Sequence, residues 1–467
     1  MKEQLFQEYF RDAPTAVNVP QIREQWLALT PPYDVDHWLL PLPVWGQRPY
    51  DHTGAEAWQT LRNDLPHAPP DRPFCIYLHI PFCSSKCHFC DCYSFKLGAY
   101  QAEHVQNYVN RLCAELRLWS QQGNLSQRPV STVHMGGGTP TFLGEAALAQ
   151  IVACCRAHFA ITQDTEWALE STVESLTPGM MATMHRAGYR RLHLGVQSLE
   201  EPVRTAIGRR RPVAELLDRI EQMLALGWVV SVDLVCGLPG QTLAGFVAGI
   251  QTLAAAGVNG FSLYELLIYP QNQKWAESLG LARRSHVPNY FMFQAGANVL
   301  AGYGFGRSLF NHWADGRDHN IYFTFPTRGE DCLAVGTIAD GVMGDYHYRH
   351  PRYAAYMRQC GVEQPGLQGG LRRTAMESAL LPVRTAVLSG AIPSQLALAL
   401  QTVPVNGQSL LHHWQQQRLI QPDADGGFVL TANGGWFAGN MVRQWHNVAA
   451  GFVKTTARLT PSAGCSG

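Results

Sequence analysis

Short apolar runs alternate with helical stretches between about residues 74 and 268. The apolar runs are "CIYLHI", "STVHMGGG", "EWALEST", "RLHLGVQSL", "VVSVDLVCGLPG" and "GFSLYELLI". Helical stretches such as "HVQNYVNRLCAELRLWS" and "PVAELLDRIEQMLALG" separate them. Six strands that alternate with helices predict parallel βα units in an α/β fold. Because a full barrel needs eight such units, we expect a partial (β/α)6 barrel over residues 73–285.

The regions on either side of this pattern differ in character. Residues 1–72 are rich in Pro and Trp with little periodicity, so we expect an irregular segment packed on another part of the chain. Residues 286–365 are rich in aromatic residues and glycine and predict a connecting segment that covers the substrate. A helical domain is expected at 366–455, followed by a tail at 456–467.

The C-terminal domain has a winged-helix-like order. The stretch "SLLHHWQQQRLIQPDADGGFVLTANGGWFAGNMVRQW" predicts a helix, a hairpin around Asp425–Gly427 and a helix capped by Thr431. No stripe of Lys and Arg accompanies this order, so we expect a small packing domain and no nucleic-acid partner.

Composition limits the class of protein. The 467 residues are 46% hydrophobic and 15% charged, as is typical of a globular chain, and the formal net charge is zero. No apolar run of about 18 residues occurs, so no membrane span is expected. The N-terminal stretch carries acidic residues and does not look like a secretory signal, so we expect the reducing cytoplasm.

Four of the twelve cysteines lie close together in "YLHIPFCSSKCHFCDCYSF". Disulfides are disfavoured in a reducing compartment. A structural zinc site usually pairs two cysteine clips, and here there is one, although His79 and His88 could complete a single site. The C-x3-C-x2-C spacing supplies three thiolates for a four-iron cluster and leaves one iron open. From the residues alone, Cys92 remains a possible fourth ligand, which would close that iron.

These motifs resemble the radical S-adenosylmethionine (SAM) superfamily and, within it, the oxygen-independent coproporphyrinogen III oxidase-like family. The resemblance runs from about Tyr77 through the C-terminal domain and includes "YLHIPFC", "GGGTP", "LGVQS", "VDLVCGLPGQT" and "LTANGGWFAGNMVRQW". It implies a [4Fe-4S] cluster held by Cys83, Cys87 and Cys90, with SAM chelating the open iron. It places Cys92 beside these three without a ligand role.

The resemblance also implies the SAM contacts. These are Tyr77, Gly137, Gly138, Thr139, Glu170, Gln197, Arg209 and Asp233. Glycines permit close approach of the main chain to the SAM ammonium, while Glu170 matches a carboxylate that binds SAM. Glu174 competes for that role but is expected to be a solvated residue at the start of a helix.

Three functions remain open within the family. They are methyl transfer to heme or a porphyrinogen, oxidative decarboxylation of coproporphyrinogen III, and heme delivery by a chaperone without turnover. Cys92 favours the oxidase, whereas the Trp-rich "PLPVWGQRPYDHTGAEAWQTL" and "LYELLIYPQNQ" slightly favour methyl transfer. The expected partners are a tetrapyrrole and an electron donor such as flavodoxin or ferredoxin.

Several aromatic, acidic and histidine residues are substrate candidates without an assigned role. Those that could face the substrate are Tyr264, Glu265, Tyr322 and Tyr346, and those that could touch a heme iron are His312, His319, His347 and His350.

Overall fold

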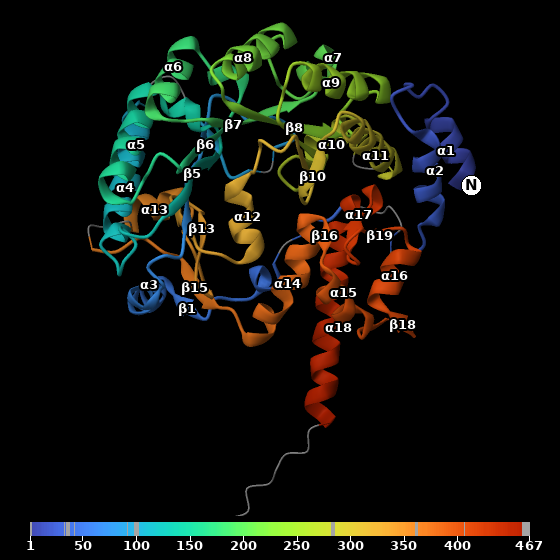
Figure 1. Cartoon of the computed structure of the whole chain (residues 1–467). Helices are drawn as coiled ribbons and strands as arrows, with labels where there is room; N and C mark the ends of the chain where they lie inside the picture. The colour runs from blue at the N-terminus through green and yellow to red at the C-terminus, as the bar shows by residue number, and fades with distance from the viewer. Residues whose placement is uncertain are drawn as a thin grey trace, which may run out of the picture.

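A computed structural model describes residues 2–31, 33, 38–41, 43–90, 92–97, 102–281, 285–359, 363–405 and 407–459. Strands curve around the centre of the molecule, and helices cover them on the outside (Figure 1). No helix within these ranges is long and apolar enough to cross a membrane.

The six predicted strands are present and form the parallel core of one sheet, which confirms the partial barrel. They are β2 (Phe74–Ile80), β5 (Val130–Gly137), β6 (Glu166–Ser171), β7 (Arg191–Gln197), β8 (Val229–Cys236) and β9 (Gly260–Glu265). They lie side by side in chain order. All six carboxyl ends therefore meet at one edge, where a parallel barrel carries its chemistry.

Helices return the chain between these strands. They are α4 (Ala102–Ser120), α5 (Glu145–His158), α6 (Pro178–Ala187), α7 (Glu201–Ala206), α8 (Val213–Ala225) and α9 (Leu243–Ala255). Thr177 caps α6 by accepting a hydrogen bond from the Met180 amide, and Gly188 ends that helix in the left-handed conformation. Such local signals explain why the βα pattern could be read from the sequence.

The sheet extends beyond the six predicted strands on both sides. On one side, β12 (Cys332–Val335) pairs in parallel with β2, and β13 (Asp340–Met343), β14 (Tyr346–Arg349), β15 (Gly369–Arg372) and β1 (His52–Thr53) continue antiparallel. On the other side lie β11 (His312–Ala314) and β10 (Gly306–Leu309). Helix α12 (Ile321–Arg328) contacts β2 and β5 from the concave side (Figure 1).

The N-terminal residues form helices that the irregular pattern did not predict. Helices α1 (Lys2–Tyr9) and α2 (Val19–Ala28) place Phe6 and Trp26 against Phe291 of α11 (Val287–Gly302). After them come the short turn η1 (Val44–Gln47) and helix α3 (Gly54–Asp64). Each helix is short and gains its stability from packing, so its pattern is weak in the sequence.

The C-terminal domain has the expected helix–hairpin–helix order. It begins with α14 (Ala375–Ser389) and α15 (Ser394–Gln401), and continues through α16 (Leu410–Gln416), β19 (Ile420–Pro422), β20 (Phe428–Leu430), α17 (Ala432–Trp436) and α18 (Ala438–Leu459). Asp423 accepts hydrogen bonds from the Asp425 and Gly427 amides in the hairpin turn. Thr431 caps α17 by accepting from the Gly434 amide, as predicted.

Candidate active site

A cavity of about 350 Å³ lies at the carboxyl ends of the parallel strands. Ten of the eleven predicted metal and cofactor residues line it: Cys83, Cys87, Cys90, Gly137, Gly138, Thr139, Glu170, Gln197, Arg209 and Asp233. These residues come from segments far apart in the chain, and the parallel sheet and the loops that follow its strands bring them together. Tyr77 is the exception, because it does not line this cavity.

The cysteine loop is held at its base by a short ladder. Strand β3 (Phe82–Cys83) pairs in parallel with β4 (Phe95–Lys96), so the loop leaves and returns at one point. The Cys90 amide donates to the Cys87 carbonyl at 3.2 Å, which makes a tight turn between these two residues. The Thr139 hydroxyl donates to the Cys83 sulfur at 3.6 Å and links the loop to the glycine run.

The thiols differ in exposure. Cys83 is buried, Cys87 and Cys90 are half-buried, and Cys92 is exposed, although all four line the cavity. Burial raises the pKa of the Cys87 thiol, and the nearby Arg209 guanidinium opposes that effect. A guanidinium beside the loop favours the thiolate form that a cluster requires.

The glycine run fits against the cysteine loop without space for side chains. A Cβ on Gly138 would lie 2.6 Å from the Phe82 carbonyl oxygen, and one on Gly137 would lie 2.5 Å from the His79 ring. The Gly138 amide donates to the Ile80 carbonyl at 2.6 Å, and the Thr139 amide donates to the Phe82 carbonyl at 2.8 Å. These amides therefore hold the loop, and the close packing of the glycine run leaves its main chain at the cavity wall.

Glu170 ends β6 with its carboxylate in the cavity. It accepts hydrogen bonds from the Gly137 amide at 3.0 Å and from His134 Nε2 at 3.3 Å. Burial raises the pKa of Glu170, but the hydrogen bond and charge of His134, with His193 and the Gly137 amide, outweigh burial and hold the pKa below its usual value. The carboxylate is thus an anion at neutral pH, able to accept from a cationic or hydroxyl ligand.

Gln197 has an unusual backbone conformation at the end of β7. Its φ is +70°, in the left-handed region that non-glycine residues rarely occupy, and the pairing with β8 shifts register between Gly195 and Gln197. A Cβ on Gly195 would lie 2.9 Å from the Gln197 amide nitrogen and 3.1 Å from the Arg209 guanidinium. The bulge turns the Gln197 side chain to the cavity, and strained residues of this kind gather at functional sites.

Arg209 is buried beside the cysteine loop. Its Nη1 lies 3.3 Å from Glu174 Oε2, while its Nε is buried without a hydrogen-bond partner. Glu174 is therefore part of the cavity wall and not the solvated residue that the sequence indicated. An unsatisfied guanidinium nitrogen at a cavity wall fits an anionic group of a ligand, such as a carboxylate.

Asp233 on β8 belongs to a polar chain that the sequence did not reveal. Its Oδ1 lies 2.5 Å from His193 Nε2, and His193 Nδ1 lies 2.8 Å from the Ser231 hydroxyl. Burial lowers the pKa of His193, but the Asp233 carboxylate outweighs burial and raises it above its usual value. The available signal was the alternation of the polar residues Arg191 and His193 with leucines in "RLHLGVQ", which places both polar side chains on one face of the strand.

Tyr77 lies deeper in the barrel than the cavity. Its hydroxyl is 3.1 Å from His79 Nδ1, and its ring stacks on Tyr322 with centroids 4.8 Å apart. His79 Nε2 lies 3.2 Å from the Tyr93 carbonyl, so both of its ring nitrogens have partners and neither is available to a zinc ion. The contact of Tyr77 with a cofactor stays a prediction, and the structure places His79 and Tyr322 beside it.

The candidate histidines have different environments. His312 Nε2 and Nδ1 lie 2.8 Å from Asp318 and Ser262, and His350 contacts Glu115 and the Ala339 carbonyl. Both histidines are buried with both ring nitrogens engaged, which leaves none for a heme iron. His347 lines a separate cavity of about 430 Å³, and His319 is exposed.

The other substrate candidates lie in three different parts of the structure. Tyr264 and Glu265 line the cavity at the strand ends, whereas Tyr322 lies inside the barrel beside Tyr77. Tyr346 lies in the sheet extension, where its hydroxyl is 2.9 Å from His52 Nδ1.

The residues present fit a four-iron cluster and SAM. The cluster would be held by the three thiols of the C-x3-C-x2-C loop. Among the described residues, no three His, Cys, Asp or Glu side chains converge as ligands of a single ion do, and cluster ligands lie farther apart because each binds its own iron. Around the thiols lie the Glu170 carboxylate, the buried Arg209 guanidinium and the glycine run. The two charged groups match the charges of the amino acid group of SAM. Fold and site thus define an iron–sulfur α/β-barrel protein.

The comparisons name the domain. Residues 77–253 match the model of the radical SAM superfamily, so this chain carries a radical SAM domain. The cofactors of such a domain are a [4Fe-4S] cluster and SAM.

Curated relatives are similar over part of the chain. The heme chaperone HemW of Mycobacterium tuberculosis (strain CDC 1551 / Oshkosh) is 33% identical over 200 residues, 43% of this chain and 51% of the chaperone. Anaerobilin synthase of Escherichia coli O157:H7 is 26% identical over 302 residues, 64% and 66% of the two chains. Oxygen-independent coproporphyrinogen III oxidase of Escherichia coli (strain K12) is 25% identical over 320 residues, which cover 65% of this chain and 69% of the oxidase. The chain thus spans about half the length of the first relative.

A solved structure has the same fold. Coproporphyrinogen III oxidase (HemN) from Escherichia coli superposes with a TM-score of 0.72 over 85% of this chain and 95% of the oxidase, at 20% identity. This likeness extends the common fold beyond the radical SAM domain to the C-terminal elements.

Proposed function

We propose that this protein is a radical SAM enzyme that acts on a tetrapyrrole. One observation carries the proposal: the cavity at the strand ends gathers the cysteine triad, the Glu170 carboxylate and the buried Arg209 guanidinium. The tetrapyrrole is proposed because the named relatives include a heme chaperone and a coproporphyrinogen III oxidase.

The chain's own residues bind and orient the cofactors in this proposal. Cys83, Cys87 and Cys90 would hold the cluster, and SAM would bind beside these three thiols. When bound and reduced, these cofactors supply a 5′-deoxyadenosyl radical that removes a hydrogen atom from the substrate.

The remaining cavity residues position SAM. Arg209 donates to the carboxylate of SAM, and Glu170 accepts from its polar hydrogens. Gln197 and Asp233 lie at neighbouring strand ends and contact the ribose, while His193 holds the Asp233 side chain in place. The cavity walls exclude water and oxygen from the reacting atoms.

The type of reaction on the tetrapyrrole is also part of the proposal. Methyl transfer, which the sequence slightly favoured, gains no support from the comparisons, so we propose oxidative decarboxylation of the coproporphyrinogen oxidase type. Heme delivery without turnover is the second candidate, because the 33% identity is with a heme chaperone. A flavodoxin or ferredoxin would supply the electron. We also propose a cytoplasmic location, because that compartment is reducing and disfavours disulfides between the clustered thiols.

The test is product analysis under anaerobic conditions. The reconstituted protein is incubated with SAM, a reductant and either coproporphyrinogen III or heme, and nucleosides and tetrapyrrole masses are measured. Decarboxylation yields 5′-deoxyadenosine and a substrate that has lost carboxyl groups. S-adenosylhomocysteine together with a methylated tetrapyrrole would instead establish methyl transfer. Stable heme binding without either nucleoside would establish the chaperone, and no binding or turnover of either tetrapyrrole would refute the proposal.

A further inference from the structure

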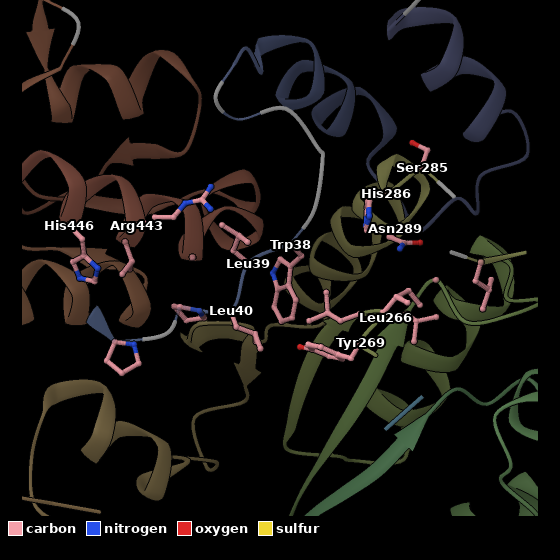
Figure 2. A pocket seen from close by; sticks show the side chains of 18 of the residues that line it. Trp38, Leu39, Leu40, Leu266, Tyr269, Ser285, His286, Asn289, Arg443 and His446 are labelled. Atoms are coloured by element: carbon pink, nitrogen blue, oxygen red, sulfur yellow. The ribbon is translucent and has the colours of Figure 1, made fainter. Parts of the chain in front are cut away.

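A second and larger cavity adjoins the cavity of the cysteine loop. Its volume is about 720 Å³, within the range of pockets that hold cofactors or small molecules. Figure 2 shows its walls: the segment around Trp38 in the centre, α18 with Arg443 and His446 on one side, and the start of α11 with His286 and Asn289 on the other. We call this cavity the α18 chamber.

The α18 chamber and the cysteine cavity share a wall. Trp38, Leu40, Leu266, Leu267 and Tyr269 line both. Trp38 is buried, stacks on Phe310 with centroids 5.1 Å apart, and leaves its indole Nε1 without a hydrogen-bond partner. A molecule in the α18 chamber would therefore lie next to the cavity where the radical is formed.

The surface of the α18 chamber suits a molecule with an apolar body. Leu40 is 39% exposed and Ile268 is 36% exposed, and both belong to the lining. Large apolar side chains that stay exposed in a concave site indicate a ligand that covers them.

The charges of the α18 chamber suit an anion. No carboxylate occurs among its described lining residues, whereas Arg443 is exposed to it and makes no ion pair within the described chain. His446 follows one turn later on α18, with Nε2 buried and unpartnered. Nearby Arg384 hydrogen-bonds only to the Thr327 and Pro41 carbonyls and adds a second positive charge.

Among the described residues near the opposite wall, the acidic side chain is that of Glu265, and hydrogen-bond donors surround its carboxylate. The Glu265 carboxylate accepts from His286 Nδ1 at 2.5 Å, from Asn289 Nδ2 at 2.9 Å and from the Trp38 amide at 2.9 Å. These contacts join the end of β9, the start of α11 and the Trp38 segment. These hydrogen bonds satisfy both carboxylate oxygens, so Glu265 needs no further partner from a ligand in the chamber.

We infer that the α18 chamber binds the tetrapyrrole substrate, with its apolar macrocycle on Leu40 and Ile268 and a carboxylate side chain on Arg443. This inference rests on the proposed function and adds the place and polarity of substrate binding. Trp38 then separates the macrocycle from SAM until the reacting substituent enters the cysteine cavity.

The test compares two probes that share the macrocycle and differ in charge. Protoporphyrin IX carries two carboxylates, and its dimethyl ester carries none. Each is titrated against the anaerobically reconstituted full chain, with porphyrin fluorescence as the signal.

We expect the wild-type protein to bind the free acid more tightly than the ester. Arg443→Met should weaken binding of the free acid about tenfold, as expected for one lost charge-assisted hydrogen bond, and leave the ester unaffected. Arg358→Met, at another exposed arginine on a helix, is the matched control.

A second variant tests occupancy independently of charge. Asn447→Trp places a large side chain in the α18 chamber from the exposed surface of α18 and should weaken binding of both probes. If Arg443→Met keeps the wild-type preference for the free acid, the inference is overturned while the proposed function stands. If Arg443→Met does not fold, unchanged affinity of Asn447→Trp for both probes overturns the inference. Failure of the wild-type protein to bind either probe would overturn the inference together with the tetrapyrrole part of the proposed function.

Discussion

At the residue scale, the cysteine loop separates three thiols from a fourth by exposure. Cys83 is buried and Cys87 and Cys90 are half-buried, while Cys92 is exposed on the same loop. We predict that replacing Cys83, Cys87 or Cys90 by Ala abolishes the iron–sulfur absorbance, because three thiolates are needed to hold the cluster. Cys92→Ala is the matched control and should keep it. Iron and sulfide analysis after anaerobic reconstitution decides the matter. Full iron and sulfide content in any of the three variants, or loss of iron and sulfide from Cys92→Ala, would contradict the ligand set.

The Glu170 carboxylate lines the cavity and is the SAM contact that we propose to test. Glu170→Gln keeps the shape of the side chain and removes its charge, so we expect SAM binding to weaken. A charge-assisted hydrogen bond contributes about 1.5–3 kcal/mol, which corresponds to roughly 10- to 150-fold in Kd. Equilibrium dialysis with SAM measures this change. Glu166→Gln on the same strand is the control, because Glu166 contacts Thr132 and does not line the cavity. An unchanged Kd for Glu170→Gln would place the SAM contacts elsewhere.

At the element scale, one buried carboxylate joins a barrel helix to the sheet extension. Glu115 on α4 accepts from His350 Nε2 at 2.6 Å, from the Tyr356 hydroxyl at 2.7 Å and from Trp119 Nε1 at 3.0 Å. His350 follows β14 and Tyr356 lies on α13 (Tyr353–Gln359). The contact therefore fixes the extension of the sheet, which the sequence did not predict, against the predicted barrel.

We predict that Glu115→Gln lowers the free energy of unfolding by about 3–5 kcal/mol, because it leaves a buried histidine without its anion. Glu103→Gln, exposed on the same helix, is the control and should change little. Urea unfolding at several pH values measures both variants.

The difference between the wild type and Glu115→Gln should depend on pH. Burial lowers the pKa of His350, but Glu115 outweighs burial and raises it. The stabilisation that protonated His350 contributes is therefore complete below its unfolded pKa of about 6.5. It is lost as the pH rises through the folded pKa of His350. Burial raises the pKa of Glu115, but His350, Tyr356 and Trp119 outweigh it and lower the pKa, so its own effect is lost only in acid. We expect the largest difference between about pH 4.5 and 6.5. A difference that stays constant to pH 9 would contradict this coupling.

At the scale of the whole molecule, three regions of the chain meet around two cavities. The barrel supplies the strand ends, the N-terminal segment supplies Trp38 (Figure 2), and the C-terminal domain supplies α18 (Figure 1). Trp38 and Leu40 are the described residues of the N-terminal segment that line the cavity of the cysteine loop, and Trp38 is the larger of the two.

We predict that Trp38→Ala exposes the cluster to oxygen. Removing the indole should join the two cavities and cost about 3–5 kcal/mol of stability, as large-to-small core changes do. The rate at which the cluster absorbance bleaches in air should rise several-fold. Trp45→Ala is the control, because Trp45 is buried in the same segment but lines a different cavity. Equal bleaching rates in the two variants would show that Trp38 is not the barrier.

The amino-acid sequence by itself determined the parallel core and the chemistry of the loop. Strands such as Arg191–Gln197 carry strong local signals, because apolar runs, capping residues such as Thr177 and glycines such as Gly188 act within a few residues. The C-x3-C-x2-C spacing is likewise local, so the three thiols could be singled out without a structure. The same holds for the hairpin around Asp425–Gly427 and the Thr431 cap.

Only the tertiary structure decided what depends on distant contacts. The polar chain of Asp233, His193 and Ser231 exists because adjacent strands pair in one register, and the ion pair of Arg209 with Glu174 joins two separate loops. Tyr77 lies away from the cavity because Tyr322, 245 positions later in the chain, stacks on it. The α18 chamber is bounded by Trp38, His286 and Arg443, residues that become neighbours only after three regions pack together. A side chain's partners across such separations are set by packing and not by local pattern, and for that reason they could not be read from the sequence.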